Sequence, residues 1–271
     1  AARPPLVVIR TALQDTIGSY CSFCEMPVHV EEGVASKRMR TLNGTPDLSN
    51  WDDLLLACDW CRHFRTSDAD RLDDYLWPDV DPTFAIGAGS PFIYSLREVS
   101  YNLIDAEANL LQTSTQTLSF VAANPALADD RARNTIDLLQ LNTPFYNEAS
   151  NTFNVSNAER LIDRRVHLRT KAWGLAQKAI TALRTAIDDG DPSFYASTAA
   201  LAASLAQAAG FWSVWMTALW EAFGDRKIIR DVLLETDNCD AYEVVGYQTV
   251  PDGGSPPWKL FTGTAIDRMT F

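Results

Sequence analysis

The spacing of apolar and polar residues divides the chain into a first part with short strands and a second part that is mainly helical. Leu6–Ile17 has apolar residues at near-helical spacing, and Gly18 is suited to end that helix. Residues 26–30 and 34–40 have the composition of two short strands joined by a turn at residues 31–33. The first part therefore combines a helix with a small β-structure.

Three further segments have a clear period. We expect a helix from residue 61 to about residue 72. Apolar and polar residues alternate over residues 92–121, which predicts a β-hairpin, although residues 109–112 also fit a helix. Residues 126–141 are expected to be helical. The hairpin is the one β element that we expect in the second part.

The remaining periodic segments predict helices. Residues 156–159 (Ser-Asn-Ala-Glu) form a capping-box pattern, which predicts an amphipathic helix over residues 156–188 with Gly190 at its end. Two or three more helices are expected within residues 193–235. In residues 211–220, Phe and Trp recur at spacings of three to five, so this helix is apolar on most faces. That pattern favours a core position over a partner interface.

Together these elements predict an α+β protein. A chain of 271 residues allows one large domain or two closely packed ones. We place a small module at residues 1–84 and a mainly helical region packed on it at residues 85–271, with the boundary near residues 81–82. The tail from residue 252 is rich in Gly and Pro and is expected to be irregular.

The charge of the chain narrows the candidate functions. The formal net charge is −12 and the isoelectric point is about 4.6. Proteins that bind nucleic acid usually present a basic face to the phosphates, so this balance disfavours a free-standing nuclease without excluding nucleic-acid binding. Two local basic clusters are interpreted as solvated faces and ion pairs: Lys37, Arg38 and Arg40, and Arg160, Arg164, Arg165, Arg169 and Lys171.

No feature of the sequence predicts a membrane protein. Apolar runs are all shorter than the ~18–20 residues that span a bilayer. Residues 1–13 lack the basic start and apolar stretch of a signal peptide. We therefore expect a cytoplasmic protein.

Four of the five cysteines form two pairs with metal-ligand spacing. The pairs are Cys21-x2-Cys24 and Cys58-x2-Cys61, with 33 residues between them. A two-residue spacer lets both sulfurs of a pair reach one tetrahedral zinc ion. Disulfides and a redox-active pair are the alternatives to a zinc site. A reducing compartment disfavours disulfides. Because the four cysteines fill the coordination sphere, the predicted zinc is structural. The lone Cys239 is interpreted as a buried or inert thiol.

The sequence around these pairs resembles a known family. Residues 20–26 (Y-C-S-F-C-E-M) resemble the opening of bacterial HNH endonucleases, which include the nuclease subunit of Septu anti-phage systems. Residues 51–65 (W-D-D-L-L-L-A-C-D-W-C-R-H-F-R) are similar to the family's W-x-N-x-L-L-A-C-x-x-C-N-x-x-K. Residues 74–84 (D-Y-L-W-P-D-V-D-P-T-F) are similar to its D-Y-x-W-P-D-x-D-N-T-F. Weaker similarity continues at residues 135–142, 163–165 and 210–216.

The resemblance implies an HNH (ββα-metal) module, in which zinc clamps a hairpin against the helix after the second cysteine pair. Ten residues after the second cysteine the family has V-E-H-x-x-P-K-S, where this chain has V-A-S-K-R-M-R-T. In the family the acid binds a divalent metal and the His activates water. In this chain the acid corresponds to Ala35 and the His to Ser36. The family's orienting Asn corresponds to Asp53, the Asn after the last cysteine to Arg62, and the helix Lys to Arg65.

These departures imply that the catalytic centre is lost. Alanine cannot bind a metal, and serine is no base near neutral pH. We expect Ser36 on the second strand, facing the helix near Cys61, with Arg62 or Arg65 filling the space of the metal and pairing with Asp53.

Two histidines offer a rescue of the chemistry. His29 and His63 could converge with Asp53 on a relocated metal site, or they are an exposed strand residue and an exposed helix residue. The favoured interpretation is a pseudo-nuclease that acts as a binding or scaffolding subunit of a bacterial defence complex, with an ATPase subunit as the partner that the resemblance implies. The alternative is an active metal-dependent endonuclease with a rearranged site. An unrelated enzyme in the helical region is a third possibility, for which the sequence offers no motif.

Overall fold

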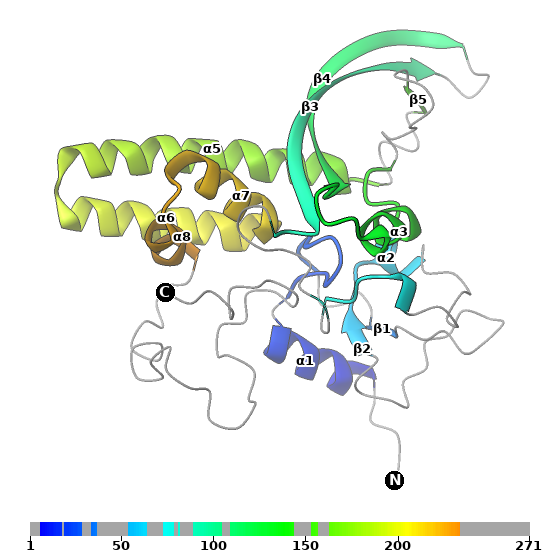
Figure 1. Cartoon of the computed structure of the whole chain (residues 1–271), viewed down its shortest axis with the longest axis horizontal. Coiled ribbons are helices and arrows are strands. Elements are labelled where there is room, and N and C mark those ends of the chain that lie inside the picture. The colour runs from blue at the N-terminus through cyan, green and yellow to red at the C-terminus, as the bar shows by residue number, and fades with distance from the viewer. Residues whose placement is uncertain are drawn as a thin grey trace.

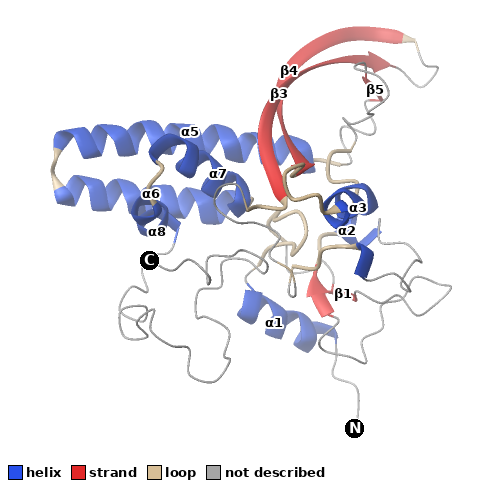
Figure 2. Ribbon diagram, viewed as in Figure 1, coloured by secondary structure: helices blue, strands red, loops and turns tan. Residues whose placement is uncertain are grey.

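The computed structural model has an α+β fold and describes ten segments of the chain (Figures 1 and 2). These are residues 6–17, 19–28, 34–36, 54–63, 73–78, 81, 89–104, 109–143, 153–156 and 163–233. Within them, no helix combines the length and the hydropathy needed to cross a membrane.

The first part contains the predicted helix α1 (Leu6–Ile17), two short strands and a short helix. Strand β1 (Val34–Ser36) pairs antiparallel with β2 (Leu54–Leu56), with Val34 opposite Leu56 and Ser36 opposite Leu54. Ile9 and Leu13 of α1 form a small apolar cluster with Val34 and Leu54, so the helix covers this sheet. Figure 1 shows α1 alongside β1 and β2.

The strand prediction for this part needs a correction. The partner that the structure gives to β1 is β2, a strand that the sequence analysis did not predict. All three leucines of β2 are buried, so the segment lacks the alternation by which a half-buried strand is recognised. Pro27 makes an isolated bridge with Tyr20, while residues 29–33 and 37–50 lie outside the described residues. Helix α2 (Asp59–His63) begins two residues before the predicted start, and residues 64–72 are not described.

The predicted β-hairpin is confirmed as β3 (Phe92–Ile104) and β4 (Leu110–Ala123). Residues 110–112 are strand, so the helical alternative for that segment is wrong. Strand β5 (Phe153–Ser156) pairs parallel with the distal end of β3, which gives the strand order β4-β3-β5. The hairpin curves away from the helices, as Figure 1 shows.

Helices α3 (Asp130–Leu138) and α5 (Arg165–Asp189) are both shorter than predicted. Asp129 caps α3, because its side chain accepts from the N–H of Arg131. The prediction that residues 156–159 open α5 is wrong, because Ser156 belongs to β5 and pairs with Ile104. The C-terminal end of α5 is confirmed: Gly190 adopts a left-handed conformation with φ of 75°.

Three more helices follow, where two or three were predicted: α6 (Pro192–Ala209), α7 (Trp212–Phe223) and α8 (Arg226–Leu233). Helices α5 and α6 lie antiparallel, and α7 and α8 pack across them (Figure 1). The expected core position of α7 is confirmed, because Trp212, Trp215 and Met216 are buried.

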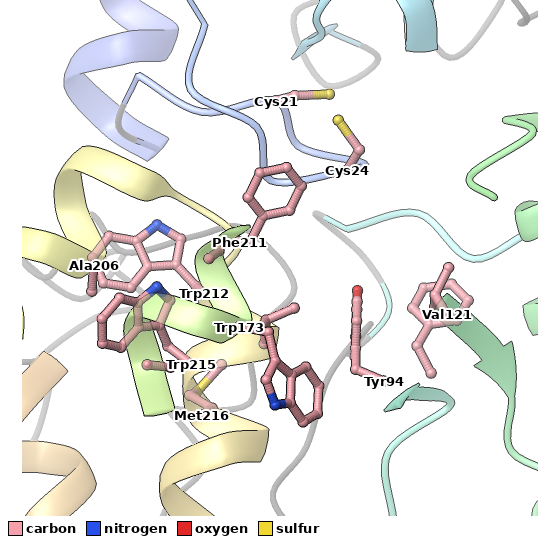
Figure 3. Close-up of a cluster of buried hydrophobic side chains, with 14 of the residues drawn as sticks. Cys21, Cys24, Tyr94, Val121, Trp173, Ala206, Phe211, Trp212, Trp215 and Met216 are labelled. Atoms are coloured by element: carbon pink, nitrogen blue, oxygen red, sulfur yellow. The ribbon is translucent and has the colours of Figure 1, made fainter. Parts of the chain in front are cut away.

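One apolar cluster joins the cysteine pairs to the helical region. It contains all four paired cysteines as well as Trp173, Phe211 and Trp215. Figure 3 shows Cys21 and Cys24 above Phe211, with Trp212 and Trp215 of α7 further below. The boundary near residues 81–82 stays a prediction, but the two predicted regions share this core.

Candidate metal centre

Two tight turns of the backbone position the four cysteines. In the first, the N–H of Cys21 donates to the Met26 carbonyl (2.9 Å) and the N–H of Glu25 donates to the Cys21 carbonyl (2.9 Å). Glu25 takes a positive φ of 65°, which closes the turn. The second turn opens α2, where the N–H of Cys61 points at the Cys58 sulfur at 3.5 Å. The two turns are joined directly, since the N–H of Ser22 donates to the Leu56 carbonyl (2.8 Å).

The four sulfurs form a compact, buried set. All lie within 4.8 Å of one another, and Cys24 Sγ is 3.7 Å from Cys58 Sγ. A tetrahedral ion with zinc–sulfur bonds of about 2.3 Å separates its sulfurs by about 3.8 Å, close to the observed spacing. The four cysteines are free thiols, since a disulfide would need about 2.05 Å. The set therefore has the geometry of one tetrahedral metal ion.

The crowding of the thiols shifts the pKa values of three of them. Burial by itself raises the pKa of Cys21, but hydrogen bonds from the other three thiols lower it well below its usual value. Burial and hydrogen bonding to its neighbours raise the pKa of Cys24, and hydrogen bonding to Cys21 and Cys61 raises that of Cys58. A thiolate in this space therefore raises the pKa of Cys24 and of Cys58. Four thiolates can coexist in this space only around a cation, whose binding releases the protons.

A buried arginine lies against the cysteine set. Arg165 Nη1 is 3.4 Å from Cys61 Sγ and also donates to the Leu139 carbonyl at 2.8 Å. Its Nη2 donates to the Gln140 carbonyl (3.0 Å) and to Asp163 (2.7 Å). Burial opposes the charged form, but the cysteine charges and the Asp163 carboxylate raise the pKa of this guanidinium above its usual value. Arg165 thus connects the cysteine set to the end of α3.

A second buried arginine, one turn further along α5, makes a different set of contacts. Arg169 donates to the Ser119 carbonyl (2.9 and 3.1 Å), the Leu141 carbonyl (3.2 Å) and Asn142 Oδ1 (3.0 Å). Asn142 in turn bonds the N–H and carbonyl of Val121. Burial lowers the pKa of Arg169 to about 10. This arginine anchors the hairpin rather than the cysteines.

The first cysteine turn docks onto the junction between α6 and α7. The Glu25 carbonyl accepts from the N–H of Phe211 (3.0 Å), and its carboxylate accepts from the N–H (2.8 Å) and the hydroxyl of Ser213. Burial raises the pKa of Glu25 to about 7, against the lowering effect of the Ser213 donors. Tyr20 packs edge-on against Trp212 at 5.5 Å between ring centroids and donates to the Gln207 carbonyl.

The structure places only some of the predicted catalytic positions. Ala35 and Ser36 lie on β1, one residue and two residues after Val34, and their side chains are not among those described. Arg62 is half-exposed and pairs with Asp59 at 2.5 Å, a partner that the sequence analysis did not name. His63 is the last residue of α2, and nothing is described of its side chain. His29, Asp53 and Arg65 lie outside the described residues, so the predicted Asp53 pairing and the histidine rescue stay predictions.

The interpretation of the second basic cluster needs a correction. Arg164 and Lys171 are exposed, but Arg165 and Arg169 are fully buried and are no part of a solvated face. They are tolerated in the core because every guanidinium makes several hydrogen bonds to carbonyl or carboxylate oxygens. Glu25 and Arg165 both fall in segments that carried the family resemblance, yet their contacts were not predicted.

Comparison of the chain with protein-family models, with curated proteins and with solved structures finds no match in any of the three.

Proposed function

We propose that this protein is a zinc-stabilised, HNH-nuclease-like scaffold that does not cut nucleic acid. The observation that carries the proposal is the closed set of four buried cysteines. Tetrahedral sites made of four thiolates suit zinc, and a site with four protein ligands leaves no position for water or substrate. An ion held by Cys21, Cys24, Cys58 and Cys61 would stabilise the fold and take no part in a reaction.

We infer the lack of a cleavage centre from two residues of β1. Phosphodiester hydrolysis needs a base for the attacking water and a metal to neutralise the phosphate. Where the resembled family has an acid and a His, β1 carries Ala35 and Ser36, which supply neither. In the part of the chain that the structure describes, the four cysteines are also the only group of His, Cys, Asp or Glu placed to hold a metal.

A scaffold acts through partners, and the resemblance suggests which kind. In the Septu-type assemblies that the motifs resemble, the nuclease subunit works with an ATPase subunit. We propose a similar protein partner in a bacterial defence complex. The net charge of −12 favours a protein partner over direct binding to nucleic acid.

A plasmid-nicking assay tests this function. Supercoiled plasmid is incubated with the zinc-loaded chain and Mg²⁺, Mn²⁺ or Ni²⁺, because a single nick converts it to the relaxed form. We expect no conversion above that of a Cys58→Ser preparation. Metal-dependent nicking that disappears in His29→Ala or His63→Ala would overturn the proposal and establish an active endonuclease with a relocated metal site.

A further inference from the structure

Arg165 contacts a cysteine sulfur in addition to its hydrogen bonds with oxygen acceptors. Its guanidinium already has acceptors in Asp163, the Leu139 carbonyl and the Gln140 carbonyl, yet Nη1 also lies 3.4 Å from Cys61 Sγ. The residue is buried, and so is Cys61. Water therefore does not screen the interaction between the guanidinium and the sulfur.

The charge of a metal-loaded site explains why a cation is needed there. One divalent ion and four thiolates carry a net charge of −2, from +2 and four times −1. A buried charge of this size is costly unless it is paired and hydrogen-bonded. Asp163 binds Arg165 from the side away from the sulfur, through Nε and Nη2, and so orients the guanidinium with Nη1 directed at Cys61.

Arg169 provides an internal comparison. It has the same side chain, lies on the same helix and is equally buried, but its hydrogen bonds go to Ser119, Leu141 and Asn142. No described hydrogen bond joins Arg169 to a cysteine. The contact with sulfur is therefore specific to Arg165 rather than general to buried arginines of α5.

We propose that Arg165 is a positioning residue of the metal centre: its N–H···S hydrogen bond to Cys61 raises the affinity of the four-cysteine site for a divalent ion and links metal binding to α3 and α5. This inference rests on the proposed zinc site and deepens it. Residues that hydrogen-bond metal ligands commonly change metal affinity by about 10–100-fold. The same guanidinium holds the carbonyls of Leu139 and Gln140, so the metal centre and the C-terminal end of α3 share one side chain.

The matched pair Arg165→Lys and Arg169→Lys tests the proposal. Both variants keep the positive charge and lose the planar fork, so both remove buried hydrogen bonds. Zinc affinity is measured on the full chain by competition with a chromogenic chelator. We expect Arg165→Lys to lower affinity at least about tenfold relative to Arg169→Lys. Cobalt(II) loading gives a second reading, because only Arg165→Lys should shift the sulfur-to-cobalt charge-transfer band.

Equal affinities and unshifted bands in the two variants would overturn the role of Arg165 while leaving the zinc site intact. Wild-type protein that binds no metal would instead overturn the proposed function. If Arg165→Lys does not fold, wild-type protein loaded with cadmium-113 decides the question by NMR. A scalar coupling between cadmium and an Arg165 guanidinium proton, transmitted through Cys61 Sγ, supports the proposal, and its absence overturns it.

Discussion

Glu25 accepts a hydrogen bond from the backbone N–H of Phe211 through its carbonyl and another from the N–H of Ser213 through its carboxylate. These N–H groups lie at the start of α7, whose own N-cap residue offers no side-chain hydrogen bond. The first turn of a helix leaves N–H groups that need acceptors. Residue 25 therefore caps a helix that begins near residue 212, and the cysteine turn and the helical region stabilise each other.

Removing this cap should destabilise the fold. In Glu25→Ala, the buried N–H and hydroxyl of Ser213 lose their acceptor, so we expect the free energy of unfolding to fall by about 2–3 kcal/mol. Glu25→Gln keeps one acceptor oxygen and should lose less than half as much. Urea unfolding measures both values. Glu221→Ala, an exposed glutamate of α7, is the control and should change stability by less than about 0.5 kcal/mol. A loss in Glu25→Ala no larger than that of the control would contradict the capping role.

Gly210 is required by a close approach of two backbones. Its φ is 67°, and a Cβ atom there would lie 2.5 Å from the Glu25 carbonyl and 2.8 Å from Pro27. Gly210→Ala should therefore cost more than about 2 kcal/mol, because neither neighbour is a flexible side-chain end. Gly224 has a similar φ of 61° with open space around it, so Gly224→Ala should cost only about 1 kcal/mol. Calorimetric melting of the two variants compares them directly; similar shifts would mean that the contact with residues 25 and 27 is unimportant.

Gly174 should behave in the opposite way. It lies in the middle of α5 on the exposed side, with nothing within 4 Å of an added Cβ. Alanine has the higher helix propensity, so Gly174→Ala should stabilise the protein by about 0.5–1 kcal/mol. A rise in melting temperature checks this, whereas a fall would show that the α5 surface at this position is covered.

Sequence patterns predicted the elements whose residues alternate or repeat locally. The hairpin of β3 and β4, further helices after residue 190 and the end of α5 at Gly190 were expected, because each depends on a local period or on glycine conformation. Strand β2 was missed, since its buried leucines show no alternation. The start of α5 was misplaced because Ser156 joins a strand whose partner, β3, lies about fifty residues earlier in the chain.

In the candidate metal centre, too, the features with a local sequence pattern were predicted and those without one were not. The spacing of the two cysteine pairs was sufficient to predict that Cys21, Cys24, Cys58 and Cys61 lie together. The contacts of Glu25 and Arg165 join segments more than one hundred residues apart, which no local pattern encodes. A run of basic residues looks solvated in sequence, and only the packing of α5 shows that Arg165 points inward.

Metal removal should unfold more than the first part of the chain. The cysteine turns and α7 share one core, and Arg165 joins α5 to Cys61. Chelation of zinc should therefore lower the melting temperature of the whole protein and expose Trp212 and Trp215. Binding of zinc to small domains supplies about 10–16 kcal/mol of folding free energy, which is comparable to the stability of an entire domain. Tryptophan fluorescence follows the change. Recovery on adding back zinc but not magnesium is the control, and unchanged emission after complete chelation would contradict the shared core.

The metal content of the folded chain decides whether the four cysteines hold an ion. Native mass spectrometry of the wild-type protein should show one zinc ion per chain, with Cys21, Cys24, Cys58 and Cys61 protected from alkylation until the ion is removed. A folded, metal-free protein whose four cysteines alkylate freely would show that these residues form no structural zinc site.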